Sequence, residues 1–250
     1  MLVRSITAFE PAETARDGAK SMIAQVEGIY PWPYDGPLNP VCTALIVTDM
    51  QRDFVDPDGW FALTGGVTAP LTAVIPSIAR ILDAARKAGL FVLFTIEAHE
   101  PDLLDLPANK LWRSKRLGRA IGAEGPLGRH LVRGTAGAAI VSPLAPHPGE
   151  PVVAKPGKSG FIGTDLDHLL RRRGIKNLIF AGITTDGAVQ CTLRDANDRG
   201  YECLILDDAT ASDVPSHHAD QIHTFSLAGG IYGSITTVDR LISVLTKADS

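Results

Sequence analysis

Runs of continuously apolar residues alternate along this chain with stretches of helical periodicity, and this alternation limits the possible folds more than any other feature. The runs lie near residues 44–47, 90–99, 177–183 and 202–209. Because they lack the apolar–polar alternation of a half-exposed strand, each predicts a strand buried on both faces, as in a parallel sheet. The stretch 70–88 has apolar residues at helical spacing and is followed by Gly89, a suitable C-cap. We therefore expect a single-domain, three-layer α/β/α fold around a mostly parallel, doubly wound sheet.

The chain is expected to divide into an N-terminal arm, residues 1–40, and one folded domain, residues 41–250. The prolines in the run YPWPYDGPLNP, residues 30–40, exclude a helix or a central strand over these residues. Earlier in the arm, a short helix is expected near residues 12–27. Trp32 and Tyr34 are expected to pack on the body of the protein or on a neighbouring subunit. Further predicted elements are a loop-rich insertion at 100–150, strands at 152–154 and 232–237, and helices at 165–173, 186–199, 213–227 and 238–247.

The composition argues against several classes of partner. The 250 residues carry a net charge of −4 and only 6% aromatic residues, which argues against nucleic-acid binding. No apolar stretch of about 18 residues could span a membrane, and the N-terminus lacks the apolar core of a signal peptide. Three cysteines without a C-x-x-C pair fit neither a disulfide framework nor a structural zinc site, and favour a reducing cytoplasm.

Polar residues end three of the predicted strands, at the edge of the sheet where parallel α/β folds bind ligands. Asp49 follows 44–47, Lys155 follows 152–154, and the turn GITTDGAVQ follows 177–183. The helix after that turn offers free backbone N–H groups at its N-terminus. Taken singly, each has an ordinary explanation as a turn residue, a solvated lysine or an N-cap. Their shared position at one edge favours a functional site.

Three segments around these residues carry motifs. They are ALIVTDMQRDF (44–54), KPGKSGF (155–161) and GITTDGAVQCTLRDA (182–196). These motifs resemble those of the isochorismatase-like cysteine hydrolases, and the resemblance extends over roughly residues 42–240. Members of that family use an Asp-Lys-Cys triad, so the resemblance implies that Asp49 and Lys155 are catalytic. Ala188 occupies the cysteine position, and its methyl group cannot attack a carbonyl.

Two explanations of Ala188 remain open. Either the catalytic cysteine has been replaced by engineering, to trap a substrate, or the chain is a natural member that binds a ligand without turnover. The retained motif residues are Thr184, Thr185, Asp186, Arg194 and Asp195. Their retention favours replacement, because a chain drifting away from catalysis would lose some of them. Cys191 is expected to be a buried structural thiol, because it would lie roughly 4–5 Å beyond residue 188 along the helix axis.

The resemblance implies a mechanism for a form with cysteine at position 188. Asp49 would accept the thiol proton, Lys155 would favour the thiolate, and the thiolate would attack an amide carbonyl. Backbone N–H groups of Thr184 and Ala188 would form the oxyanion hole, after a cis peptide bond between Ile183 and Thr184. Ammonia would leave, and water would hydrolyse the thioester.

Four segments outside the triad motifs point to a substrate class. They are residues 30–38, 97–118, 125–134 and 195–206. These segments are similar to biuret hydrolases and related ureide amidohydrolases. The similarity implies cleavage of a C–N amide bond in a small ureide of the biuret or triuret type, with release of ammonia. The alternatives are a catalytically dead ligand-binding or scaffold protein, a ureidoacrylate hydrolase, and an isochorismatase-type vinyl-ether hydrolase.

Substrate contacts are expected from residues in or near the motifs. The candidates are Phe54, Glu97, Asn109, Lys158, Phe161, Thr185 and Tyr232. Some relatives add a metal through an Asp-x-His sequence, but no histidine follows Asp49 or Asp53 in this region, so neither a metal nor another cofactor is expected. Relatives usually form oligomers, which implies a homodimer or a homotetramer.

Overall fold

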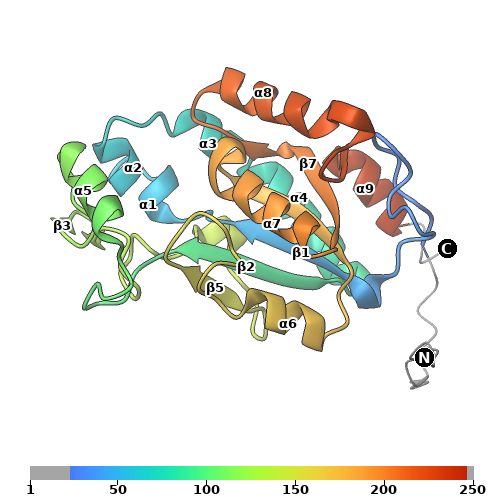
Figure 1. Ribbon diagram of the computed structural model, residues 1–250, viewed down its shortest axis with the longest axis horizontal. Coiled ribbons are helices and arrows are strands. Elements are labelled where there is room, and N and C mark those ends of the chain that lie inside the picture. The colour runs from blue at the N-terminus through green and yellow to red at the C-terminus, as the bar shows by residue number, and fades with distance from the viewer. Residues whose placement is uncertain (1–22, 247–250) are drawn as a thin grey trace, which may run out of the picture.

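The computed structural model describes residues 23–246 and contains a six-stranded sheet in which every strand pair is parallel (Figure 1). From edge to edge the strands are β5 (Val152–Lys155), β2 (Phe91–Glu97), β1 (Thr43–Thr48), β6 (Asn177–Ile183), β7 (Glu202–Ala211) and β8 (Ser234–Thr236). The chain starts with β1, adds β2 and β5 on one side, and then returns to add β6 on the other. The carboxyl ends of β1 and β6 therefore bound the switch point at which such sheets bind ligands.

Helices cover both faces of the sheet and complete the predicted three layers. One face carries α4 (Ile75–Ala88) and α9 (Val238–Leu245), and the other carries α6 (Leu166–Arg172), α7 (Gln190–Asp198) and α8 (Pro215–Ser226). Leu45 and Val47 of β1 join the first core, whereas Ala44 and Ile46 join the second. This alternation follows from the two-residue period of a strand, and it confirms that β1 is buried on both faces.

The helix predicted over 70–88 is divided in the structure into α3 (Ala69–Ala73) and α4, with a break at Val74. The break lies where Pro76 has no N–H to donate to the preceding turn and disfavours a helical backbone in the residue before it. Gly89 ends α4 with a φ of 74°, as a left-handed C-cap requires.

Short elements extend beyond the carboxyl ends of the central strands (Figure 1). They are α1 (Arg52–Val55), α2 (Trp60–Leu63), α5 (Ala108–Arg116), and a hairpin of β3 (Glu124–Gly125) and β4 (Gly128–Arg129). The last three lie in the region predicted to be loop-rich. Among the described residues, no helix is both long and apolar enough to cross a membrane.

The described part of the N-terminal arm packs into the first core. Isolated antiparallel bridges join Ile23 to Leu38 and Val26 to Trp32, so the helix expected near 12–27 is absent from 23–27 because these residues pair in extended form. The rest of that predicted helix lies outside the described residues. Trp32 is fully buried in this core, as expected, whereas Tyr34 is 74% exposed.

Candidate active site

Asp49 lies one residue beyond β1, at the switch point of the sheet. Its side chain is buried, and Thr95 Oγ1 of β2 donates a hydrogen bond of 2.8 Å to Asp49 Oδ1. The Asp49 backbone has a φ of +53°, in the left-handed region that costs such a residue about 1–3 kcal/mol. Strain of this kind at a buried carboxylate is typical of sites where the fold holds one side chain in a functional direction.

Lys155 ends β5 and reaches Asp49 past the intervening strand β2. It is fully buried, and its Nζ donates hydrogen bonds of 2.6 Å to Asp49 Oδ2 and 3.0 Å to the carbonyl of Gly157. Burial raises the pKa of Asp49, while the ion pair with Lys155 opposes the shift. A raised pKa makes the Asp49 carboxylate a better proton acceptor at neutral pH.

Glu97, at the end of β2, is a buried carboxylate surrounded by lysines. Its Oε1 lies 2.7 Å from Lys110 Nζ, and its Oε2 lies 2.8 Å from Lys158 Nζ and 4.0 Å from Lys155 Nζ. Burial alone would raise the pKa of Glu97, but the three ammonium groups together lower it to about 2. Glu97 is therefore ionised at neutral pH, and it fixes the positions of the cations beside Asp49.

The turn after β6 presents residues 184 and 188 to the site. The peptide bond between Ile183 and Thr184 is cis, as the resemblance implied, and a π-helical turn spans Thr185–Val189 before α7. The amides of Gly187 and Val189 both donate to the carbonyl of Thr184, at 3.0 and 3.1 Å. Two further contacts hold the turn from outside: Thr185 Oγ1 lies 2.8 Å from His218 Nδ1, and Ser212 Oγ donates to Asp186 Oδ1 at 2.7 Å.

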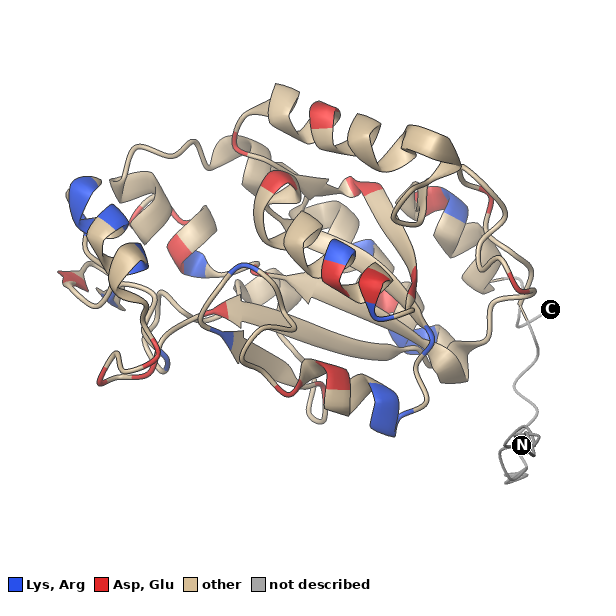
Figure 2. Ribbon diagram, viewed as in Figure 1, with Lys and Arg blue, Asp and Glu red and all other residues tan. Residues whose placement is uncertain are grey.

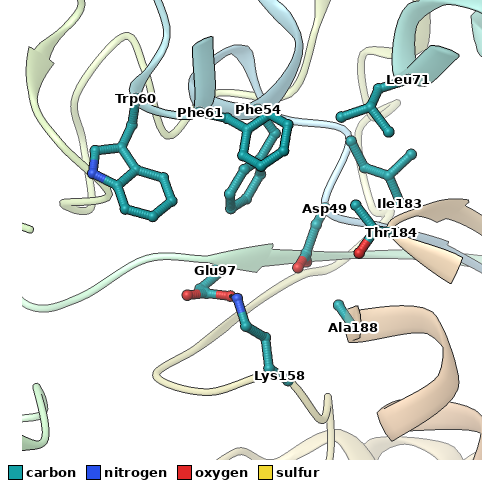
Figure 3. Close-up of a pocket in the computed structure, with 10 residues that line it drawn as sticks. All are labelled: Asp49, Phe54, Trp60, Phe61, Leu71, Glu97, Lys158, Ile183, Thr184 and Ala188. Carbon is teal, nitrogen blue, oxygen red and sulfur yellow. Dashed lines mark hydrogen bonds and ion pairs between the residues drawn. The ribbon is translucent and has the colours of Figure 1, made fainter. Parts of the chain in front are cut away.

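These elements enclose a cavity of about 220 Å³ (Figure 3). Its walls are Asp49, Phe54, Trp60, Phe61, Leu71, Glu97, Lys158, Ile183, Thr184 and Ala188. In Figure 3 the side chains of Asp49, Thr184 and Ala188 lie close together, with the Glu97–Lys158 pair beside them. The cavity thus combines a proton acceptor, the ammonium group of Lys158 and a turn with backbone N–H groups, but residue 188 supplies only a methyl group.

The predicted substrate contacts divide into two groups. Phe54, Glu97 and Lys158 line the cavity, and Asn109 lines a second chamber that adjoins it. The other three candidates, Phe161, Thr185 and Tyr232, do not line the cavity. Phe161 stacks on Tyr201 in the second core, with ring centroids 5.9 Å apart, because its loop folds back onto that core.

Thr185 and Tyr232 make structural contacts instead. Thr185 is fully buried and is bonded to His218, and Tyr232 packs edge-on against Phe225 and beneath Arg194. Thr185 and Tyr232 lie close to the motifs in the sequence, but this closeness does not predict which neighbours bury each side chain.

Some site residues were not predicted from the sequence. Thr95 precedes Glu97 by two residues, so the strand period places both side chains on one face of β2, and this signal could have revealed it. Lys110 lies in the region predicted to be loop-rich, where no periodic pattern predicts contact between Lys110 and Glu97. Phe61 and Leu71 reach the cavity from α2 and α3, whose packing the local sequence does not specify.

Cys191 lies on α7 and is half-buried rather than buried as expected, because the first turn of α7 is only partly covered. Burial raises the pKa of its thiol. Within residues 23–246, one group of three side chains brings possible metal ligand atoms within 4.8 Å of one another: Asp186, Asp213 and His217. None of the three lines the cavity.

Comparison with known proteins supports the same assignment of fold. A model of the isochorismatase domain matches residues 43–237. Ureidoacrylate amidohydrolase RutB of Azorhizobium caulinodans is 35% identical over 178 residues, which cover 70% of this chain and 78% of that protein.

Solved structures match over most of their length. A cysteine hydrolase from Pseudomonas syringae pv. phaseolicola 1448A has a TM-score of 0.73 and 26% identity, covering 90% of this chain and 98% of that one. N-carbamoylsarcosine amidase from Thermoplasma acidophilum has a TM-score of 0.60 and 26% identity, covering 79% and 96%. These similarities confirm the predicted α/β fold and the resemblance carried by the motifs.

Proposed function

Because the chain belongs to the isochorismatase family of hydrolases, we propose that its cavity binds a small ureide in position for cleavage of a C–N amide bond at residue 188. Ala188 supplies no nucleophile, so this chain binds the ureide without forming a thioester, and a cysteine at the same position completes an amidohydrolase. The observation that carries the proposal is that Asp49, buried and paired with Lys155, shares one cavity with Thr184 and Ala188. Relatives named for amide cleavage support it.

The size and walls of the cavity favour a small planar ligand. The cavity volume of about 220 Å³ lies below the range of about 300–1,000 Å³ that is usual for ligand pockets. Phe54 and Trp60 offer apolar ring faces, while Glu97 and Lys158 offer hydrogen-bond acceptors and donors. A ureide presents this combination, a flat conjugated body with carbonyl acceptors and N–H donors along its edge.

With cysteine at position 188, Asp49 and the turn after β6 each have a defined task. Asp49 accepts the thiol proton, and the thiolate attacks the amide carbon. The N–H groups of residues 184 and 188 bind the oxyanion, a contribution of about 3 kcal/mol per donor. Asp49 returns the proton to the leaving nitrogen, so ammonia departs and a thioester remains. Asp49 then takes a proton from water, whose oxygen displaces the sulfur and releases the acid, and Asp49 returns this proton to the thiolate.

The test compares this chain with its Ala188→Cys variant for ammonia release from biuret, triuret and ureidoacrylate, with nicotinamide as a control amide. Only the cysteine variant should release ammonia, and adding Asp49→Asn to it should abolish release. The unmodified chain should show a raised Tm with the ureide that the variant prefers, because a ligand stabilises the state that binds it. Absence of both ammonia release and Tm shifts across the ureides would contradict the proposal.

One observation favours a second candidate, vinyl-ether hydrolysis. Residue 188 carries only a methyl group, and vinyl-ether cleavage needs no nucleophile there, because it begins with protonation of the substrate by an acid, a role that Asp49 would take. This reaction predicts release of pyruvate from isochorismate by the unmodified chain. Release that Asp49→Asn abolishes would support the second candidate over the first.

A further inference from the structure

Asp53 is a buried carboxylate that the proposed function leaves without a role. It lies on α1, close in the chain to Asp49. Its Oδ1 accepts a hydrogen bond of 3.2 Å from the backbone N–H of Trp60, and its Oδ2 accepts one of 2.9 Å from the backbone N–H of Leu131. Each carboxylate oxygen therefore serves one backbone amide, and an amide nitrogen can only donate.

No cation within the described residues forms an ion pair with the Asp53 carboxylate. Figure 2 shows an acidic and a basic residue next to each other on α1, but the basic residue, Arg52, pairs with Asp56 at 2.7 Å. Burial lowers the pKa of the neighbouring His130, so its imidazole is uncharged at neutral pH. Burial also raises the pKa of Asp53, although the two amides oppose the shift, so ionisation of Asp53 lowers the stability of the fold as the pH rises. A contribution to stability therefore does not explain this charge.

The first amide belongs to an aromatic wall of the cavity, formed by Phe54, Trp60 and Phe61. Phe54 follows Asp53 directly in the chain. Trp60 and Phe61 both pack edge-on against Phe54, with ring centroids 6.4 and 6.5 Å from its own. Figure 3 shows the three rings together on one side of the cavity. Because the rings contact one another, a displacement of the Trp60 backbone would move the aromatic wall as a unit.

The second amide belongs to a segment that is bound to the end of β2. The carbonyl of Leu131 accepts a hydrogen bond of 2.8 Å from the N–H of His99, and the N–H of Arg133 donates to the carbonyl of His99 at 2.9 Å. Leu131 has a φ of +53°, in the left-handed region that a leucine rarely adopts, and it is fully buried. Strain of this kind persists where the surroundings fix the backbone, and it is concentrated at functional sites. Asp53 thus joins the aromatic wall to a strained segment held on the central sheet.

Gly137 closes a third side of the carboxylate. The N–H of Asp53 donates to the carbonyl of Gly137 at 2.7 Å, and a Cβ at Gly137 would lie only 2.5 Å from Asp53 Oδ1. The orientation of the Asp53 side chain is therefore fixed by backbone on three sides.

We propose that Asp53 is a positioning residue whose carboxylate holds the aromatic wall against the cavity and thereby sets the affinity for flat ligands. Only an ionised carboxylate offers an acceptor to both amides, because the carboxamide of an asparagine would turn its NH₂ group towards one of the two donors. The position of the wall is independent of any ligand, whereas the effect on affinity rests on the proposed function.

Acrylamide quenching of tryptophan fluorescence measures the position of the wall without a ligand. Trp112 is exposed and Trp32 is fully buried, so in chains that carry Trp112→Phe the quenching reports on Trp60. Asp53→Asn in this background should raise the quenching constant about twofold, because one amide loses its acceptor and the wall moves outwards.

Two further variants accompany Asp53→Asn. Gly137→Ala should also raise the quenching constant, because its Cβ displaces the same carboxylate while the charge remains. It decides the question if Asp53→Asn does not fold. Asp56→Asn is the matched control, because Asp56 pairs with Arg52 and does not line the cavity, so the quenching constant should not change.

Calorimetry with biuret, triuret and ureidoacrylate measures the effect on affinity. For each of these ureides that the unmodified chain binds, Asp53→Asn should raise the Kd about tenfold, as expected for loss of a hydrogen bond to a charged group. A merely structural role would lower the free energy of unfolding but would leave the quenching constant and the Kd of the folded protein unchanged.

Unchanged quenching in both Asp53→Asn and Gly137→Ala would overturn the inference and leave the proposed function intact. Raised quenching with an unchanged Kd would overturn the assigned effect on affinity. If the unmodified chain binds none of the three ureides, the proposed function fails, whereas the quenching constants still decide whether Asp53 holds the wall.

Discussion

Ala188 contributes a methyl group to a cavity that also holds the buried carboxylates of Asp49 and Glu97. Asp49 and Lys155 are buried and paired at 2.6 Å, and Glu97 holds two further ammonium groups within 2.8 Å. Burying ions costs several kcal/mol per group, and such pairs seldom add net stability. These buried ion pairs lie beside Asp49, whose backbone is in the left-handed region. Their presence is therefore better explained by ligand binding or reaction than by a contribution to stability.

The ion pair predicts a large effect of Lys155→Met. The substitution leaves the Asp49 carboxylate buried without its cation, so the free energy of unfolding should fall by about 3–5 kcal/mol at pH 7. The double variant Asp49→Asn/Lys155→Met should recover part of the loss, because it buries no charge at either position. Denaturant titrations of the three chains measure this coupling. Equal losses in the single and double variants would contradict it.

Glu97 predicts a specific pH dependence of stability. Its pKa is about 2 in the folded protein, below its ordinary value of 4.5. The stabilisation linked to this shift, roughly 3 kcal/mol, is fully present above about pH 4.5 and is lost as the pH falls towards 2. In Glu97→Gln that contribution is absent, so the free energy of unfolding should rise less steeply with pH between 2 and 4.5. Parallel curves for the two chains would show that Glu97 is not held ionised.

The turn after β6 is the element that positions residue 188. Contacts to Thr185 and Asp186 hold it from α8 and from the end of β7, and Gly187 adopts φ −119° and ψ −105°, outside the helical region. A Cβ at Gly187 would lie 2.5 Å from Thr184 Oγ1, so a side chain there would require the Thr184 hydroxyl group to move. The backbone of the proposed oxyanion hole is therefore expected to be sensitive to a side chain at position 187.

Gly187→Ala should displace this turn. We expect a loss of about 1–3 kcal/mol in the free energy of unfolding, together with loss of the Tm shift that a ureide produces. Gly157→Ala is the control, because a Cβ there would meet nothing within 4 Å. Unchanged ligand binding by Gly187→Ala would show that the ligand does not use the turn.

The elements also show how far local sequence predicts this structure. The strands were predicted well, since their continuous apolar runs reflect burial on both faces. The break at Val74 was missed because the apolar periodicity runs on through Pro76. At the site, Asp49 and Lys155 follow from the strand ends and the motifs. The side-chain positions of Phe161 and Tyr232 depend on the core against which their loops pack, and no local sequence pattern predicts that packing.

On the scale of the whole molecule, the switch point between β1 and β6 brings together residues far apart in the sequence. The described part of the arm belongs to the same unit, because Trp32 is buried in the core that α4 and α9 share. Trp32→Ala should lower the free energy of unfolding by about 3–5 kcal/mol and keep a single cooperative transition. Tyr34→Ala, at an exposed site, should change it by less than about 0.5 kcal/mol. Comparable effects of the two substitutions would contradict this placement of the arm.

According to the proposed function, this site lacks only a sulfur atom to react with a ureide. The most direct measurement is intact-protein mass spectrometry of the Ala188→Cys variant, quenched in acid during turnover of its preferred ureide. The predicted result is a mass increase equal to the ureide minus ammonia, absent from the unmodified chain and from the variant that also carries Asp49→Asn. Ammonia release without this adduct, or equal release by the unmodified chain, would contradict the proposed function.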